Sequence, residues 1–168
     1  MILDRRMPKM ELKTISLPTR QIEIEVYTSS TETSENVPAI LLLHELFGVL
    51  DCYREDAQDL ANRGYLVYVP NLFSGGAVKY CIRAMVTKAG RTNAADSDMN
   101  KEIHALLDAL KADPRSNGRL GMLGQCLTGG YVIQMAKRDD MLAPVIYHHS
   151  LGVEGVGVPK TETLDDIR

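Results

Sequence analysis

The chain has 168 residues, of which 45% are hydrophobic and 24% are charged. This is the composition of a globular protein, so it excludes an intrinsically disordered or fibrous chain, and the length fits one domain over residues 1–168. The formal net charge of −3 gives no electrostatic reason to bind nucleic acid or an anionic membrane.

The first forty residues follow a β pattern. Ile22, Ile24 and Val26 alternate with glutamates, which is typical of a half-buried strand. We expect an earlier strand over residues 9–17 to pair with it, and the polar stretch 28–36 to form a loop.

From residue 37 onward, apolar segments alternate with amphipathic ones. Residues 39–43 are apolar at every position, as in a parallel strand covered on both faces. Asp51 is expected to cap a helix that Gly64 ends, and the apolar face of this helix is predicted to carry Tyr53, Ala57, Leu60 and Ala61. The later elements are expected to be strands at 65–69, 119–124 and 143–149, helices at 78–89, 98–111 and 128–138, and a turn at 117–118. This order predicts an α/β fold with a doubly wound, mostly parallel sheet and antiparallel N-terminal strands.

The segment GMLGQCLTGG, residues 121–130, lies where a buried strand must turn sharply into a helix. A nucleophile on such a turn is exposed but strained, so the residues two before and two after it must be small. Gly124 and Thr128 occupy those positions around Cys126, and the start of the helix favours the thiolate form of this cysteine. A structural cysteine beside a tight glycine turn is the competing interpretation.

A second motif, LHELFG at residues 43–48, follows the first fully buried strand. At this place α/β-hydrolases build half of their oxyanion hole. We expect the backbone N–H groups of Leu46 and Leu127 to stabilise a developing oxyanion together, and each such donor lowers the barrier by about 3 kcal/mol.

With LANRGYLVYVPNLF at residues 60–73, these motifs resemble the dienelactone hydrolase family over roughly residues 20–155. The resemblance implies an α/β-hydrolase fold that hydrolyses small esters or lactones through a Cys-His-Asp triad, with no cofactor. No metal is expected either, because the chain has no C-x-x-C pair that could bind zinc. It makes Cys126 the nucleophile, Glu45 the glutamate that contacts the resting thiol, and Leu46 and Leu127 the oxyanion-hole amides. Without the resemblance, Glu45 would be read as a carboxylate paired with a nearby arginine.

The family also uses an arginine to hold the substrate carboxylate. Arg83 and Arg91 are the candidates in this chain, and neither is favoured over the other.

The chain departs from the family pattern after the nucleophile. The triad acid is expected after a strand that would follow 143–149, and the histidine later still, but the sequence stops at Arg168. His148 and His149 end a strand beside the nucleophile strand, yet no acid is placed to orient either ring, so lining of the pocket is favoured over a base role. We therefore expect a C-terminally truncated family member with impaired hydrolysis.

Four other reactive side chains receive structural interpretations. His44 is expected to shape the oxyanion loop, and His104 to be a solvated helix residue. Cys52 and Cys81 fall on amphipathic helices and are read as small packing residues.

The remaining patterns concern environment and partners. No C-x-x-C pair is present, the N-terminus lacks the apolar core of a signal peptide, and the longest aliphatic run is far shorter than the ~20 residues of a membrane helix. A cytoplasmic protein is therefore expected. The strand at 143–149 would form a sheet edge with exposed Val145 and Ile146, which invites self-association.

Two alternatives to an esterase stay open. One is a non-catalytic α/β module that binds a small ligand or a partner chain, which the missing acid and histidine favour. The other is a thiol redox protein that uses Cys126, which the lack of a second cysteine close in sequence disfavours.

Overall fold

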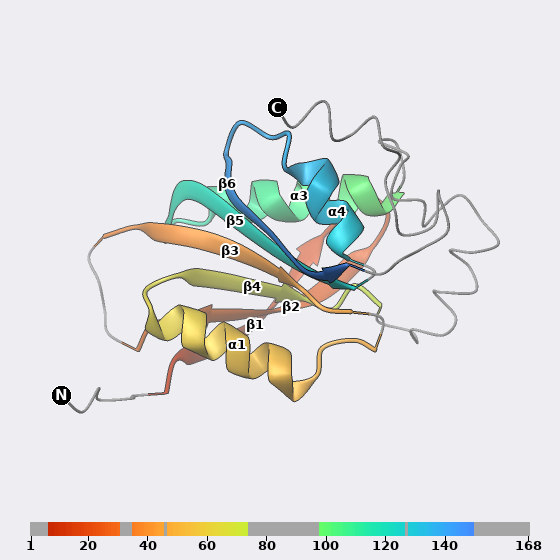
Figure 1. Cartoon of the computed structure of the whole chain (residues 1–168). Helices are drawn as coiled ribbons and strands as arrows, with labels where there is room; N and C mark the ends of the chain where they lie inside the picture. Colours follow the sequence, from red (N-terminus) through yellow and green to blue (C-terminus); the bar gives the residue numbers. More distant parts are fainter. Residues whose placement is uncertain (1–6, 31–34, 46, 74–97, 127, 150–168) are drawn as a thin grey trace.

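The computed structural model describes residues 7–30, 35–45, 47–73, 98–126 and 128–149. Their centre is a six-stranded sheet in the order β1-β2-β4-β3-β5-β6 (Figure 1). The strands are β1 Lys9–Ser16, β2 Gln21–Thr28, β3 Val37–Leu43, β4 Leu66–Pro70, β5 Ser116–Cys126 and β6 Met141–His149. The helices are α1 Asp51–Asn62, α3 Asp98–Ala112 and α4 Gly129–Met135. The helix expected at 78–89 lies outside the described residues.

The sheet is mixed as the sequence predicts. β1 pairs with β2, and β2 with β4, in antiparallel fashion, whereas β3, β4, β5 and β6 run parallel to one another. The predicted fold class is therefore confirmed, and within the described segments β6 forms one edge of the sheet.

Two layers of apolar side chains hold the helices against the sheet, one on each face. On one face, the α1 residues Tyr53, Ala57 and Ala61 pack against Leu42 of β3 and its neighbours, which confirms the predicted apolar stripe. On the other face, α3 buries four residues that recur at helical spacing: Ile103, Leu106, Leu107 and Leu110. Full burial of each such side chain stabilises the fold by about 1.5–3 kcal/mol.

Three local expectations are wrong. Asp51 does not cap α1, because it is the first helical residue and its carboxylate instead binds Arg54 at 2.9 Å. The expected turn at 117–118 lies inside β5, where Gly118 has a φ of 81° and the pairing with β3 shifts register, as in a β-bulge. Cys52 is exposed rather than packed.

The last helix is also shorter than expected, since α4 ends at Met135 rather than near residue 138. Arg138 lies in the turn that follows and binds Asp140, so the chain folds back towards β6 there. Within the described part of the chain, every helix is too short or too polar to cross a lipid bilayer.

Candidate active site

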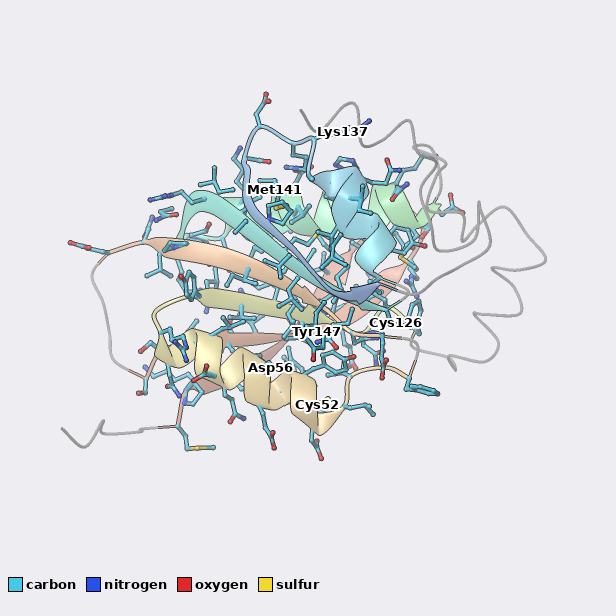
Figure 2. The ribbon with its side chains drawn as sticks, viewed as in Figure 1. Cys52, Asp56, Cys126, Lys137, Met141 and Tyr147 are labelled. Carbon is cyan, nitrogen blue, oxygen red and sulfur yellow. The ribbon has the colours of Figure 1, made fainter. Side chains whose placement is uncertain are left out.

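The nucleophile turn (residues 124–128) begins at the carboxyl end of β5. Among the described residues, Cys126 is the one non-glycine residue with a positive φ, 52° (Figure 2 labels it at the end of this strand). An L-residue in this left-handed conformation is strained by roughly 1 kcal/mol. The sharp, strained turn that the sequence predicts is therefore present.

Gly124 is required by the close approach of the chain to itself. A Cβ atom at this position would lie 2.6 Å from Cγ2 of Val132 and 2.7 Å from the carbonyl oxygen of Thr128. Real Cβ atoms do not come so close, so the expected need for a small residue two positions before Cys126 is explained by α4 packing directly on the turn.

Thr128 does more than provide a small side chain. It is fully buried, its hydroxyl accepts a hydrogen bond from the backbone N–H of Gln125 at 2.9 Å, and the same hydroxyl donates to the carbonyl oxygen of Gln125 at 2.9 Å. The backbone N–H of Thr128 also donates to this carbonyl at 3.0 Å. These three hydrogen bonds fix the backbone on both sides of Cys126.

His44 is buried at the end of β3, and both of its ring nitrogens bind backbone groups. Nε2 accepts a hydrogen bond from the backbone N–H of Leu72 at 3.0 Å, so Nδ1 carries the proton and donates to the carbonyl oxygen of Glu45 at 2.6 Å. Burial lowers the pKa of His44, which keeps the ring neutral. With both nitrogens engaged, His44 shapes the loop after β3, as expected, and has no nitrogen free for proton transfer.

Tyr53 of α1 connects this loop to the nucleophile turn. Its buried hydroxyl accepts a hydrogen bond from the backbone N–H of Glu45 at 3.0 Å and donates to Oε1 of Gln125 at 3.4 Å. Burial raises the pKa of Tyr53 to about 12, so the hydroxyl keeps its proton at neutral pH. The sequence placed Tyr53 only in the apolar core, and this polar role was missed.

Glu45 itself is half-buried. The alternative of a pair with a nearby arginine finds no support at Arg54, the arginine on the facing helix. Arg54 is held by Glu25 at 2.9 Å and by Asp51 at 2.9 Å. Leu46 and Leu127, like Arg83 and Arg91, lie outside the described residues.

The strand register brings the two expected halves of the site together. Leu43, the last residue of β3, pairs with Gly124 of β5, so the loops after these two strands start side by side. The backbone of His149 pairs with Cys126 across β6 and β5, which puts the carboxyl end of β6 at the same end of the sheet as the nucleophile turn.

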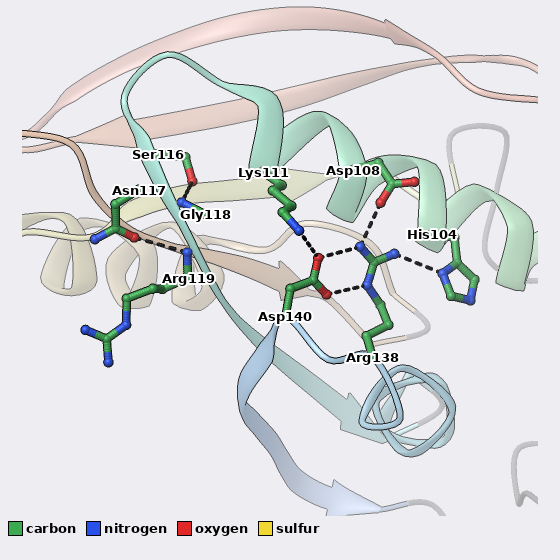
Figure 3. Close-up of polar contacts among 9 residues, drawn as sticks. All are labelled: His104, Asp108, Lys111, Ser116, Asn117, Gly118, Arg119, Arg138 and Asp140. Atoms are coloured by element: carbon green, nitrogen blue, oxygen red, sulfur yellow. Dashed lines mark hydrogen bonds and ion pairs between the residues drawn. The ribbon is translucent and has the colours of Figure 1, made fainter.

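Asp140 lies at the amino end of β6, far from the carboxyl end of the sheet where Cys126 lies. This carboxylate forms ion pairs with Arg138 at 2.9 Å and with Lys111 at 2.9 Å (Figure 3). Hydrogen bonds from Arg138 and Lys111 hold the pKa of Asp140 well below its usual range. Arg138 also binds His104, which is exposed as expected. Asp140 therefore cannot orient a histidine at Cys126.

A mostly parallel sheet flanked by helices, with a strained residue on the turn between a strand and a helix, defines an α/β-hydrolase fold. Solved structures share it: m3DLH has a TM-score of 0.67 and 20% identity, covering 97% of this chain and 66% of that one. The dienelactone hydrolase-like promiscuous phosphotriesterase P91 from metagenomic libraries has a TM-score of 0.70 and 15% identity, covering 96% of this chain and 75% of that one.

Residues 24–166 match the model of the dienelactone hydrolase family, and the chain belongs to this family. A curated relative, carboxymethylenebutenolidase 1 of Cupriavidus pinatubonensis (strain JMP 134 / LMG 1197), is 28% identical over 138 residues. That match covers 79% of this chain and 56% of the relative. The chain thus spans about half the length of the curated relatives it matches.

Proposed function

We propose that the chain carries the nucleophile and the oxyanion hole of an enzyme that hydrolyses a small carboxylic ester or lactone. The observation that carries this proposal is the conformation of Cys126, which is strained, partly exposed and beside the loop after β3. Membership of the dienelactone hydrolase family and a relative named as a carboxymethylenebutenolidase support a lactone or ester as the substrate.

In this mechanism the Cys126 thiolate attacks the carbonyl carbon, and the carbonyl oxygen becomes an oxyanion that the N–H groups of Leu46 and Leu127 stabilise. Collapse of the oxyanion breaks the C–O bond, and the alcohol leaves with the proton that the thiol gave up. A thioester remains on Cys126. Water then adds to it, the C–S bond breaks, and the acid and the free thiol are released.

We expect slow release of the acid. Water attack on a thioester needs a general base, and the engaged nitrogens of His44 exclude it from that role. His104 binds Arg138, which also binds Asp140 at the amino end of β6, whereas Cys126 lies at the carboxyl end of the neighbouring β5. His148 and His149 end β6 beside Cys126, and the sequence favours a pocket-lining role over a base role for them. We therefore expect acylation without rapid turnover.

The test is a burst experiment with p-nitrophenyl acetate. The wild-type chain should release about one equivalent of p-nitrophenol, and mass spectrometry should locate one acetyl group on Cys126. Cys126→Ala should abolish the burst, whereas Cys52→Ala, which removes an exposed thiol elsewhere, should leave it unchanged. A full burst from Cys126→Ala would refute the assignment, and a stable thiol without any burst would favour the non-catalytic module.

The same proposal places the chain in the cytoplasm, where reducing conditions keep a catalytic thiol free.

A second candidate function is association with another copy of the chain through β6. This edge strand exposes four apolar side chains, and an open groove of about 560 Å³ continues from it over β5 and β3. The exposed side chains are Leu142, Val145, Ile146 and Tyr147. Two copies of one edge can pair antiparallel about a twofold axis, which satisfies the backbone groups of both.

Analytical ultracentrifugation tests this association. The wild-type chain should show a concentration-dependent dimer, and Val145→Lys should remain monomeric. Leu12→Lys is the matched control, because Leu12 is an exposed apolar residue on β1, the opposite edge strand. A monomer at all concentrations, or equal loss of the dimer in both variants, would contradict the proposal.

A further inference from the structure

A continuous series of hydrogen bonds crosses the carboxyl end of the sheet. Leu72, after β4, donates its N–H to His44, and the His44 ring donates to the carbonyl of Glu45. The N–H of Glu45 donates to the Tyr53 hydroxyl, which in turn donates to the side chain of Gln125. Three segments that are distant in sequence are therefore connected: the one after β4 binds His44 directly, and Tyr53 of α1 joins the loop after β3 to the nucleophile turn.

Tyr53 is the one member of this series that contacts both halves of the proposed site. Glu45 directly precedes Leu46, and Gln125 directly precedes Cys126. The ring of Tyr53 is fixed by its burial on the sheet-facing side of α1 and by an edge-to-face contact with His44, with centroids 6.3 Å apart. The packing of the ring therefore sets the position of its hydroxyl.

We propose that Tyr53 is a positioning residue for acyl transfer, which fixes the loop after β3 at the correct distance from the nucleophile turn. This inference rests on the proposed function. An oxyanion hole needs two donors from separate loops directed at one oxygen atom, and an error of about 1 Å in such an arrangement costs up to about 100-fold in rate. Without the Tyr53 hydroxyl, the Glu45 amide loses its partner and the loop can move relative to Cys126.

The test compares two reactions of the same thiol in Tyr53→Phe. Acylation by p-nitrophenyl acetate forms an oxyanion, whereas alkylation by iodoacetamide is a displacement that forms none. We expect the acylation rate constant of Cys126 to fall about 10- to 100-fold and the alkylation rate constant to stay within about twofold of wild type.

Tyr68→Phe is the matched control. Tyr68 is also buried and its hydroxyl binds Asp113 at 2.7 Å, near the amino end of β5 and away from Cys126. Tyr68→Phe should lower the stability of the protein but leave both rate constants unchanged.

Gln125→Met is a second test variant, because it keeps the hydrogen bond between Tyr53 and Glu45 and removes only the bond from Tyr53 to residue 125. It should lower the acylation rate constant by a smaller factor than Tyr53→Phe, and it replaces Tyr53→Phe in the test if that variant does not fold.

The outcomes separate the two proposals. Wild-type acylation in both Tyr53→Phe and Gln125→Met, or an equal fall of acylation and alkylation, would overturn the positioning role while leaving Cys126 as the nucleophile. Absence of any acylation of Cys126 in the wild-type chain would overturn the proposed function and the role of Tyr53 with it.

Discussion

The two ends of the parallel strands are held by different kinds of interaction. At the amino end, the Asp113 carboxylate receives hydrogen bonds from Arg115 at 2.8 Å, from Tyr68 at 2.7 Å and from Lys13 at 3.3 Å. At the carboxyl end, the hydrogen bonds of His44 and Tyr53 join neutral groups, and most of them include a backbone N–H or C=O.

This difference follows from what each end has to do. A buried carboxylate with three donors joins α3, β4 and β1, so the amino end holds elements together. The neutral groups at the carboxyl end hold loop backbone in place, so that donors keep a defined position near Cys126. The comparison predicts that the carboxyl end tolerates changes in charge better than changes in backbone position, and that the amino end shows the reverse.

The largest effect is expected from Gly124→Ala, which tests backbone position. The new Cβ would lie 2.6 Å from Val132 and force α4 away from the turn, at a cost of about 3 kcal/mol in the free energy of unfolding. Gly121→Ala is the control three residues earlier on β5, where a Cβ would meet its neighbours at an ordinary 3.5 Å. Chemical denaturation measures both, and equal stability of the two variants would contradict this account of the turn.

The contrast between these glycines also shows how far the sequence can be read. Gly124 was predictable because a strained nucleophile turn restricts the residues immediately around it. The role of Tyr53 was not, because its partner Gln125 lies 72 residues away and only the fold brings them together. Likewise, Glu102 is one of several polar residues in α3. It accepts a hydrogen bond from Arg20, 82 residues earlier, and no pattern of apolar spacing in the sequence predicts this contact.

The strands and helices themselves were predictable from apolar periodicity, since burial on one or two faces dictates the spacing of apolar residues. What the periodicity does not encode is the direction of a single polar group. Asp51 was expected to cap α1, but its carboxylate turns to Arg54 because the helix begins one residue earlier than that role requires. Local patterns therefore predicted elements and missed the hydrogen bonds that join them.

The next effect in size is expected from Asp113→Asn, which tests charge at the amino end. Arg115 and Tyr68 hold the pKa of Asp113 well below its usual range, so its contribution to stability is present above pH ~3.9 and is lost as the pH falls below that value. The asparagine variant should have a free energy of unfolding about 2 kcal/mol lower than the wild type at pH 7, because an amide accepts fewer and weaker hydrogen bonds than a carboxylate. Urea denaturation between pH 7 and pH 2.5 measures how the free energy of unfolding depends on pH. Below pH ~3.9 it should fall less steeply in the variant than in the wild type. The same steepness in both would show that Asp113 does not cause the loss of stability in acid.

The smallest effect is expected from the charge state of the carboxyl end, and it lies in a different pH range. Burial lowers the pKa of His44 below the ~6.5 of an unfolded chain, so between these two values the unfolded state binds a proton that the folded state does not. Stability should therefore decrease as the pH falls from about 7 towards 5. His44→Gln removes this titration and should flatten the dependence, although the variant will be less stable at every pH.

His104→Gln is the control for His44→Gln, because it removes an exposed histidine instead of the buried one. The pKa of His104 is also lowered, through partial loss of hydration and the charge of Arg138, but the carboxylates of Asp108 and Asp140 oppose that shift. Its removal should change the slope between pH 7 and pH 5 less than the removal of His44. If the two variants flatten the slope equally, the carboxyl end does not respond to pH through a buried neutral imidazole, and the contrast with Asp113 then reduces to the number of hydrogen bonds at each end.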